Sequence, residues 1–271
     1  MSVLVQISDP HFGTEQPPVV EALVELVHRL SPDVVVLSGD ITQRARRTQF
    51  AAARAFVDRL AAPVLLAIPG NHDVPLFNVA ARALYPYAGY TRAFGPELEP
   101  QWSSASMLVT CVNTTRPARH KDGEVSAEQV ARVCERLLAA TPGQLRIVVT
   151  HQPVHVIREH DIENLLHGHE AAIKAWSRAG ADIIMGGHIH LAYVRLLGEH
   201  HENLPRRIWA VQAGTAVSSR VRGTTPNSIN VVRHSAEDLV CSVERWDYHA
   251  RVSQFVLESE KRLKLDRGEM H

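Results

Sequence analysis

Metal-ligating side chains recur in five short blocks of this sequence. Each block combines carboxylate, amide or imidazole groups, and none contains a cysteine, which suits ions such as Mn²⁺, Fe²⁺, Fe³⁺ or Zn²⁺. The blocks supply about as many donors as two ions need if one carboxylate bridges them, and paired ions are a common device for hydrolysing phosphate esters. The blocks are Asp9-x-His11, Gly39-Asp40, Gly70-Asn71-His72-Asp73, His151 and Gly187-His188-x-His190.

The spacing within the blocks suits ligands that share an ion. In Asp9-x-His11 and in His188-x-His190, side chains two residues apart on an extended segment point the same way, so both can reach one ion. Glycines before the polar residues, such as Gly39, permit tight turns that project the next side chain into a crowded site. A lone Asp-x-His or Gly-Asp pair is common by chance, so the hypothesis depends on the joint occurrence of the blocks.

The elements that position these blocks follow from apolar patterning. Short β-branched runs predict strands, and apolar residues at helical spacing predict amphipathic helices. The first three strands alternate with helices, which predicts a parallel sheet with helices on both faces. Ligands bind at the carboxyl ends of such strands, so we expect the blocks to meet at that edge. Strands are predicted at 3–7, 34–37, 63–68, 107–112, 146–150, 181–185, 207–212, 228–232 and 239–245, and helices at 19–30, 48–60, 126–140 and 170–178.

Two stretches are less regular. Residues 74–101 contain several prolines and aromatic residues and predict loop with short helix, and segment 85–102 could be a lid, an interface or a packed loop. Residues 252–265 fit helix and strand equally well. We therefore divide the chain into a catalytic domain over 1–245 and a C-terminal extension of uncertain structure over 246–271.

In order and separation, the five blocks resemble the calcineurin-like metallophosphoesterase superfamily over residues 9–190. The resemblance implies a four-layer αββα sandwich, in which two mixed β-sheets pack face to face between helices. It also implies two divalent metal ions, with Asp40 bridging them and a hydroxide between the metals attacking phosphorus. The implied ligands are Asp9, His11, Asp40 and His190 for the first metal, and Asp40, Asn71, His151 and His188 for the second.

The same resemblance assigns catalytic roles. His72 looks like the family histidine that contacts the phosphate and protonates the leaving oxygen, and Asp73 looks like the partner of that histidine. Together with the bridging Asp40, they are the candidate catalytic residues.

Within the superfamily, segment 7–12 and the complete block 70–73 are most similar to the bacterial class III cyclic-nucleotide phosphodiesterases and the related glycerophosphodiesterases. A metal-dependent phosphodiesterase is therefore the expected function. A phosphomonoesterase acting on a small phosphorylated metabolite is the alternative, because the core motif does not separate the two. A metal-binding scaffold without catalysis ranks last, since such relatives usually lose ligands or the histidine of the Asn-His block.

Arginines are the candidates for contact with substrate, because a guanidinium can hold a phosphate oxygen. Arg116 follows the strand predicted at 107–112, and Arg220 and Arg222 lie in a Gly/Ser/Thr-rich loop after the His190 block. Three further arginines could draw in an anionic substrate or simply be solvated at a helix start: Arg44, Arg46 and Arg47.

The remaining histidines are assigned to solvated loops and turns. Sixteen histidines is a high load, which favours a metal site somewhere in the chain. His155 and its neighbours after His151 could line the mouth of the cleft, and His200-His201 is typical of a hairpin tip, with little indication of metal binding.

Composition limits the partners. Lys plus Arg and Asp plus Glu are both 29, so the formal net charge is zero, which argues against a general nucleic-acid binder. The partner that the resemblance implies is a small-molecule phosphate ester. The three cysteines form no Cys-x-x-Cys pair, and we expect a reducing cytoplasm. Neither a signal peptide nor a membrane-spanning stretch is indicated. The sequence does not determine whether the protein forms a homo-oligomer.

Overall fold

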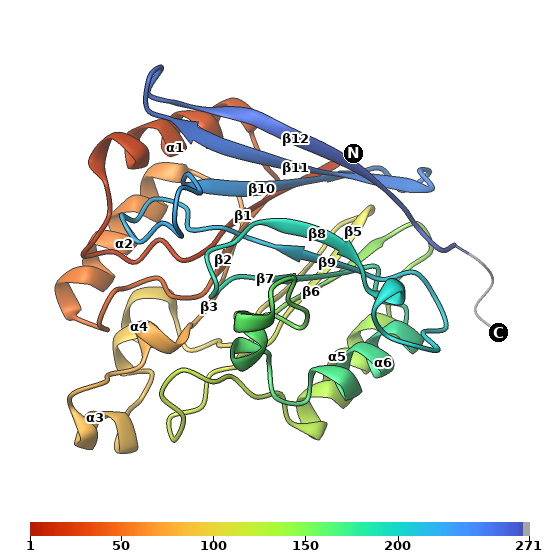
Figure 1. The fold of residues 1–271 in the computed structure, drawn as a ribbon, viewed down its shortest axis with the longest axis horizontal. Helices are drawn as coiled ribbons and strands as arrows, with labels where there is room; N and C mark the ends of the chain where they lie inside the picture. Colours follow the sequence, from red (N-terminus) through yellow and green to blue (C-terminus); the bar gives the residue numbers. More distant parts are fainter. Residues whose placement is uncertain (268–271) are drawn as a thin grey trace.

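The chain forms two six-stranded β-sheets that pack face to face, with helices on their outer faces (Figure 1). The structure, a computed structural model, describes residues 1–267. The four-layer αββα sandwich of two mixed sheets is confirmed. Within the described residues, no helix has the length and apolar character needed to cross a membrane.

The first sheet has a parallel half and an antiparallel half. Its strands, in spatial order, are β12 (Gln254–Lys264), β11 (Val240–His249), β10 (Ser228–His234), β1 (Ser2–Ile7), β2 (Val34–Ser38) and β3 (Leu65–Ile68). β1, β2 and β3 run parallel, as the alternation of strands and helices predicted, whereas β10 to β12 continue the sheet antiparallel. The segment after Trp246 is therefore strand, and β11 runs without a break across the boundary predicted after residue 245. Residues 268–271 of the predicted extension lie outside the described residues.

Helices α1 (Pro17–Leu30) and α2 (Arg47–Leu60) both cover the outer face of this sheet. Side chains alternate along a strand, so each face needs its own cover. On β1, Val5 joins the cluster under the helices, while Leu4 joins the cluster between the sheets with Ile147 of the second sheet. The prediction of helices on both faces of one sheet is wrong, because the second sheet covers the inner face.

The second sheet carries the other half of the fold. Its strands, in order, are β4 (Gln101–Ser103), β5 (Met107–Cys111), β6 (Leu145–Val149), β7 (Ile183–Gly186), β9 (Trp209–Gln212) and β8 (Tyr193–Leu196). The central four are parallel, and α5 (Ala127–Leu138) and α6 (His169–Arg178) cover the outer face around the fully buried Trp176. β4 and β8 were not predicted; both are short edge strands that pair antiparallel.

The segment between β3 and β4 holds short helices, as predicted. A 3₁₀ turn spans Asn71–Asp73, followed by α3 (Val79–Leu84) and α4 (Ala88–Phe94). α4 packs on α2 and buries Tyr90, whereas α3 buries none of its residues. In Figure 1 both helices lie on the same side of the molecule as α2.

Candidate metal centre

The five sequence blocks lie at the carboxyl ends of strands from both sheets. Asp9, Asp40 and Asn71 follow β1, β2 and β3 of the first sheet. His151 and His188 follow β6 and β7 of the second. The site therefore spans the line along which the two sheets pack, and each sheet supplies only part of it.

The backbone of this site is conformationally strained. Ten non-glycine residues of the described chain have positive φ, and five of them belong to the predicted ligand set. This left-handed region is unfavourable for residues with a side chain and persists only where the surroundings fix it. Hydrogen bonds between adjacent loops do so here, since the amide of Asp9 donates to the carbonyl of Gly39 (3.1 Å) and that of His11 to Asp40 (3.0 Å). The five residues are Asp9 (51°), His11 (44°), Asp40 (46°), His188 (71°) and His190 (53°).

One donor cluster joins both sheets through Asp9, His11 and His190. His190 Nε2 lies 3.4 Å from Asp9 Oδ1 and 3.0 Å from His11 Nε2. His11 Nε2 lies 3.9 Å from Asp9 Oδ1 and 3.8 Å from Asp40 Oδ2. The carboxylates and His11 are buried, and their donor atoms lie close enough together to bind one ion.

A second cluster contains Asp40, His151 and His188, with Asn71 beside it. Asp40 Oδ1 is 3.3 Å from His151 Nε2, so the two oxygens of Asp40 face different clusters. Asn71 Oδ1, His151 Nε2 and His188 Nδ1 are all buried without a hydrogen-bond partner. A buried polar atom left unpaired costs about 1–3 kcal/mol, so three together fit a site that binds a cation. The donor set therefore fits a pair of divalent ions that share Asp40.

Backbone carbonyls orient the imidazoles. His151 Nδ1 contacts the carbonyl of Ser38 at 2.9 Å, and His190 Nδ1 contacts that of Arg220 at 2.6 Å. A proton on Nδ1 is donated to the carbonyl in each case, which directs Nε2 at the cluster. These contacts set the tautomer and the direction of each ring.

The carboxylates of the site favour the charged form. Burial alone would raise the pKa of Asp9, but the hydrogen bond and charge of His190 outweigh it and lower the pKa to about 2. Burial also opposes ionisation of Asp40, and the surrounding histidines hold its pKa well below the usual value. Burial lowers the pKa of His11 and His188 to about 3, so both rings are neutral at pH 7 with lone pairs available to a cation.

Asp73 differs from its expected role. We predicted that it partners His72, but its carboxylate accepts hydrogen bonds from the amides of Ile41 (3.0 Å), Thr42 (2.7 Å) and Gly70 (2.9 Å). Burial, together with the charge of Asp40, raises its pKa to about 6. Asp73 therefore ties the Asp40 turn to the Asn71 turn and acts as a positioning residue.

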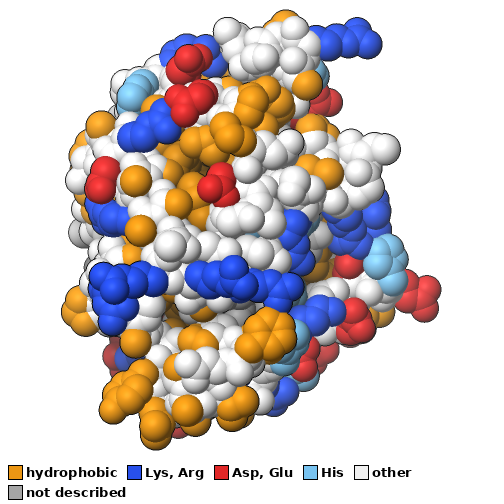
Figure 2. Space-filling view, turned by 90° about the vertical axis from the view of Figure 1, so that its left-hand side faces the viewer, with side chains coloured by type: hydrophobic (Ala, Val, Ile, Leu, Met, Phe, Trp, Pro, Cys, Tyr) orange, Lys and Arg blue, Asp and Glu red, His pale blue; other side chains and the backbone are white. Residues whose placement is uncertain are grey.

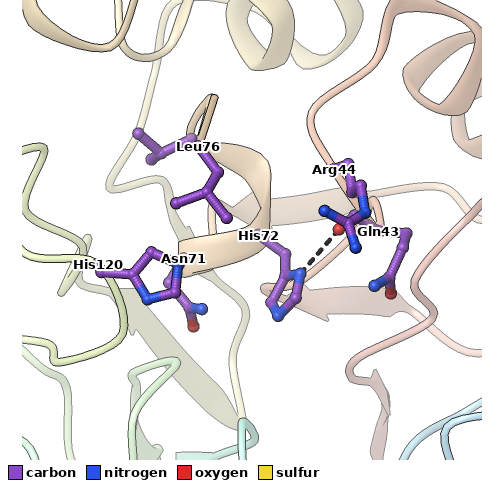
Figure 3. A pocket seen from close by; sticks show the side chains of 7 residues that line it. Gln43, Arg44, Asn71, His72, Leu76 and His120 are labelled. Carbon is purple, nitrogen blue, oxygen red and sulfur yellow. Dashed lines mark hydrogen bonds between the residues drawn. The ribbon is translucent and has the colours of Figure 1, made fainter. Parts of the chain in front are cut away.

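His72 lies at the rim of the cluster. Its Nδ1 faces the carbonyl of Gln43 at 2.8 Å, as Figure 3 shows, and its ring stands edge-on to His11 with the centroids 4.8 Å apart. A donor atom of His72 also lies within 4.8 Å of those of His11 and Asp40. Arg220 reaches the same point, with Nη1 3.2 Å from His72 Nε2 and 3.2 Å from Gln43 Oε1.

The three arginines predicted to contact substrate therefore lie in different surroundings. Arg220 enters the cluster. Arg222 lines the adjoining surface with His188 and His190 and pairs with the buried Asp161 at 2.8 Å. Arg116 instead donates to Gln129 Oε1 at 2.5 Å and to backbone carbonyls of its own loop.

Sequence reasoning missed several supporting groups. Ser8 Oγ donates to Asp9 Oδ2 at 2.6 Å, and Thr215 Oγ1 donates to the carbonyl of Asp9 at 2.6 Å. Ser8 adjoins a predicted ligand, which is a usable signal, but Thr215 lies 206 residues from Asp9 and has none. His120 also lines the cavity beside His72 and comes from a loop without a pattern.

A family model described as calcineurin-like phosphoesterase matches residues 2–192, which is most of the chain. The chain belongs to the calcineurin-like phosphoesterase family. The predicted resemblance is thus confirmed, and membership implies hydrolysis of phosphate esters. A probable cyclic nucleotide phosphodiesterase of Synechococcus sp. is 25% identical over 204 residues, which cover 71% of this chain and 74% of that relative.

Solved structures of other proteins share the fold. A purple acid phosphatase from yellow lupin (Lupinus luteus) superposes with a TM-score of 0.71 at 12% identity, over 97% of this chain and 53% of the phosphatase. This chain thus spans about half of that enzyme. Vps29 of Chaetomium thermophilum has a TM-score of 0.50 at 8% identity, over 98% of both chains. At these identities the likeness concerns the fold alone.

Proposed function

We propose that this protein hydrolyses phosphate diesters with two divalent metal ions. The observation that carries the proposal is that Asp40 faces donor atoms on two sides, His11 on one and His151 on the other. Beside it, Asn71 Oδ1, His151 Nε2 and His188 Nδ1 are buried and unpaired. Asp9, His11 and His190 would hold the first ion with Asp40. A scaffold without catalysis has no need of His72, which here keeps an oriented ring next to the clusters.

The preference for a diester rests on the sequence. Segment 7–12 and block 70–73 carry the similarity to cyclic-nucleotide phosphodiesterases, and the relative from Synechococcus sp. bears that name. A monoesterase would use the same ligands, so the two functions must be separated by substrate.

The chain's own residues have distinct tasks in the proposed reaction. Bound ions would neutralise the charge of the phosphate and lower the pKa of the attacking water. Arg220 is placed to hold a non-bridging phosphate oxygen, because its guanidinium lies between His11 and His72 and forms no ion pair among the described residues. The Gln43 carbonyl occupies Nδ1 of His72, so Nε2 is the ring nitrogen that is left to pass a proton to the leaving oxygen.

The test is hydrolysis of bis(p-nitrophenyl) phosphate and of p-nitrophenyl phosphate by metal-stripped protein, before and after addition of Mn²⁺. We expect the diester to be cleaved only with metal and with the higher kcat/KM. A strong preference for the monoester would establish the alternative function. Absence of turnover on both, with two Mn²⁺ bound per chain, would leave the family fold with a binding role and overturn the proposal.

A further inference from the structure

A groove leads outward from the metal centre on the His72 side. His72 and Asn71 line a cavity of about 110 Å³, shown in Figure 3, together with Arg44 and Leu76. Arg44 and Leu76 also line a larger groove of about 690 Å³ between the start of α2 and helices α3 and α4. The two hollows thus share a wall, and the outer one is large enough for a nucleotide-sized group.

The groove is cationic. Arg44, Arg46 and Arg47 line it from the β2–α2 side and Arg92 from α4, and all four are exposed. No carboxylate lines it, and none of the four guanidiniums forms an ion pair within residues 1–267. Figure 2 shows a band of Lys and Arg side chains crossing this face. In a chain without net charge, this concentration is a local feature that fits an anion.

The same groove carries exposed aromatic rings. Phe77 is 75% exposed and Tyr85 69% exposed, and the guanidinium of Arg44 lies 5.2 Å from the ring centroid of Phe77. These rings are not needed to hold α3, which is fixed by polar contacts of Arg82 with the carbonyls of Pro117 and Pro75. Exposed aromatic rings next to arginines form a surface on which a nucleobase can stack.

We propose that this groove binds the leaving arm of a linear dinucleotide that carries a 5′-terminal phosphate. The inference rests on the proposed phosphodiesterase activity and names its substrate class. The bridging phosphate would lie at the metal centre, the adjacent base on Phe77 or Tyr85, and the terminal phosphate among Arg46, Arg47 and Arg92. Guanidinium groups match phosphate oxygens in geometry and charge, and a cyclic nucleotide would leave this second anion site unused.

Hydrolysis of this substrate breaks one phosphorus–oxygen bond. Water adds its oxygen to the bridging phosphorus, and the bond between phosphorus and the 3′ oxygen breaks. The 3′ oxygen leaves as a hydroxyl group after taking up a proton, for which Nε2 of His72 is the proposed donor. The dinucleotide pApA and one water thus yield two molecules of AMP.

The groove favours this occupant over a lipid. An acyl chain needs a continuous apolar channel, whereas arginines line both sides of this groove. Its aromatic side chains are two rings separated by seven residues of sequence, which suits a planar group better than a long chain.

The experiment compares pApA with ApA, which lacks only the terminal phosphate. In the Mn²⁺-loaded wild type we expect kcat/KM for pApA to exceed that for ApA by about ten- to a hundredfold, the worth of one charged hydrogen-bonded group. Arg46→Ala with Arg92→Ala removes one guanidinium from each side and should bring the ratio close to one. The matched control is Arg251→Ala with Arg262→Ala, two exposed arginines at the β11–β12 hairpin, which should keep the wild-type ratio.

Binding to metal-free protein separates this inference from the proposed function. Isothermal titration calorimetry with pApA should show weaker binding to the Arg46→Ala/Arg92→Ala variant than to wild type, whether or not bis(p-nitrophenyl) phosphate is hydrolysed. Equal kcat/KM and equal affinity for pApA and ApA in wild type would overturn the groove proposal alone. A different result would be that the protein sediments with phosphatidylglycerol vesicles, that Phe77→Ser abolishes this sedimentation, and that pApA is not preferred over ApA. That result would assign the groove to lipid and would also overturn the groove proposal.

Discussion

Two histidine-rich regions of this molecule differ in what surrounds the rings. At the candidate metal centre, five imidazoles converge with the buried carboxylates of Asp9 and Asp40. The second region lies near α6 and β8, where the ring of His155 stacks on His200 with the centroids 4.6 Å apart. His201 and His169 stand nearby, with the ring of His201 5.9 Å from that of His155.

The comparison shows that histidine density alone does not make a ligand set. No three donor atoms of the second region converge within the described residues, and its rings pack against one another. At the metal centre, backbone carbonyls fix His151 and His190, and the left-handed turns hold the donors in place. Carboxylates and oriented rings, more than the number of imidazoles, distinguish the two regions.

The largest effect is expected from the shared carboxylate. Asp40→Ala removes the ligand that faces both clusters, so turnover of bis(p-nitrophenyl) phosphate should fall by at least about a thousandfold, and bound Mn²⁺ should drop with it. Circular dichroism should show a folded chain. His200→Ala, from the exposed part of the other region, should keep both activity and metal content. A normal rate and metal content in Asp40→Ala would show that the buried carboxylate is not what distinguishes the two regions.

A smaller loss of activity is expected when a methyl group is added at Gly70. At Gly70, an added Cβ would overlap the amide nitrogen and Oδ1 of Asp40 and approach His151 Nε2 to 2.8 Å, so Gly70→Ala must displace a ligand. We expect a loss of about ten- to a hundredfold in kcat/KM, as for other groups that orient ligands. Gly198→Ala is the matched control near the second region, because its Cβ would meet nothing within 4 Å. Equal activity of the two variants would show that the ligand turns are not rigid.

The sequence predicted which residues gather at the candidate metal centre better than it predicted how the fold positions them. The candidate ligands could be named because their blocks lie within a few residues of the end of an apolar run, and Asp9-x-His11 and His188-x-His190 keep local spacing. That β6 and β7 belong to a second sheet, facing β1 and β2, is a tertiary feature that alternating strands and helices do not specify. The contacts of Asp73 and Thr215 were missed for the same reason, since both join loops that are distant in sequence.

The arginines illustrate the same limit. Arg220 and Arg116 both follow strands in polar loops, and composition does not distinguish them. One guanidinium reaches His72, while the other finds Gln129 of α5 within reach. Only the packing of the loops decides which arginine meets the site.

The smallest effect concerns protonation in the second region. Burial, together with the charges of His200, His201, Arg195 and His169, lowers the pKa of His155 from 6.5 to about 4. As the pH falls below 6.5, the imidazole of His155 takes up a proton in the unfolded chain, whereas in the folded chain it stays neutral until about pH 4. His155 therefore lowers the stability of the fold as pH falls through that window, and has no such effect above it.

Replacement of His155 by phenylalanine keeps a ring against His200 and removes this titration. Urea unfolding of metal-free protein should give the wild type and the His155→Phe variant a constant difference in unfolding free energy above pH 7. By pH 5 the variant should gain about 1 kcal/mol relative to that difference, since the half-buried ring is partly screened by solvent. Parallel pH profiles would mean that the ring takes up a proton as freely as in the unfolded chain. In that case the second region would be ordinary surface, and the contrast with the metal centre would rest on the carboxylates alone.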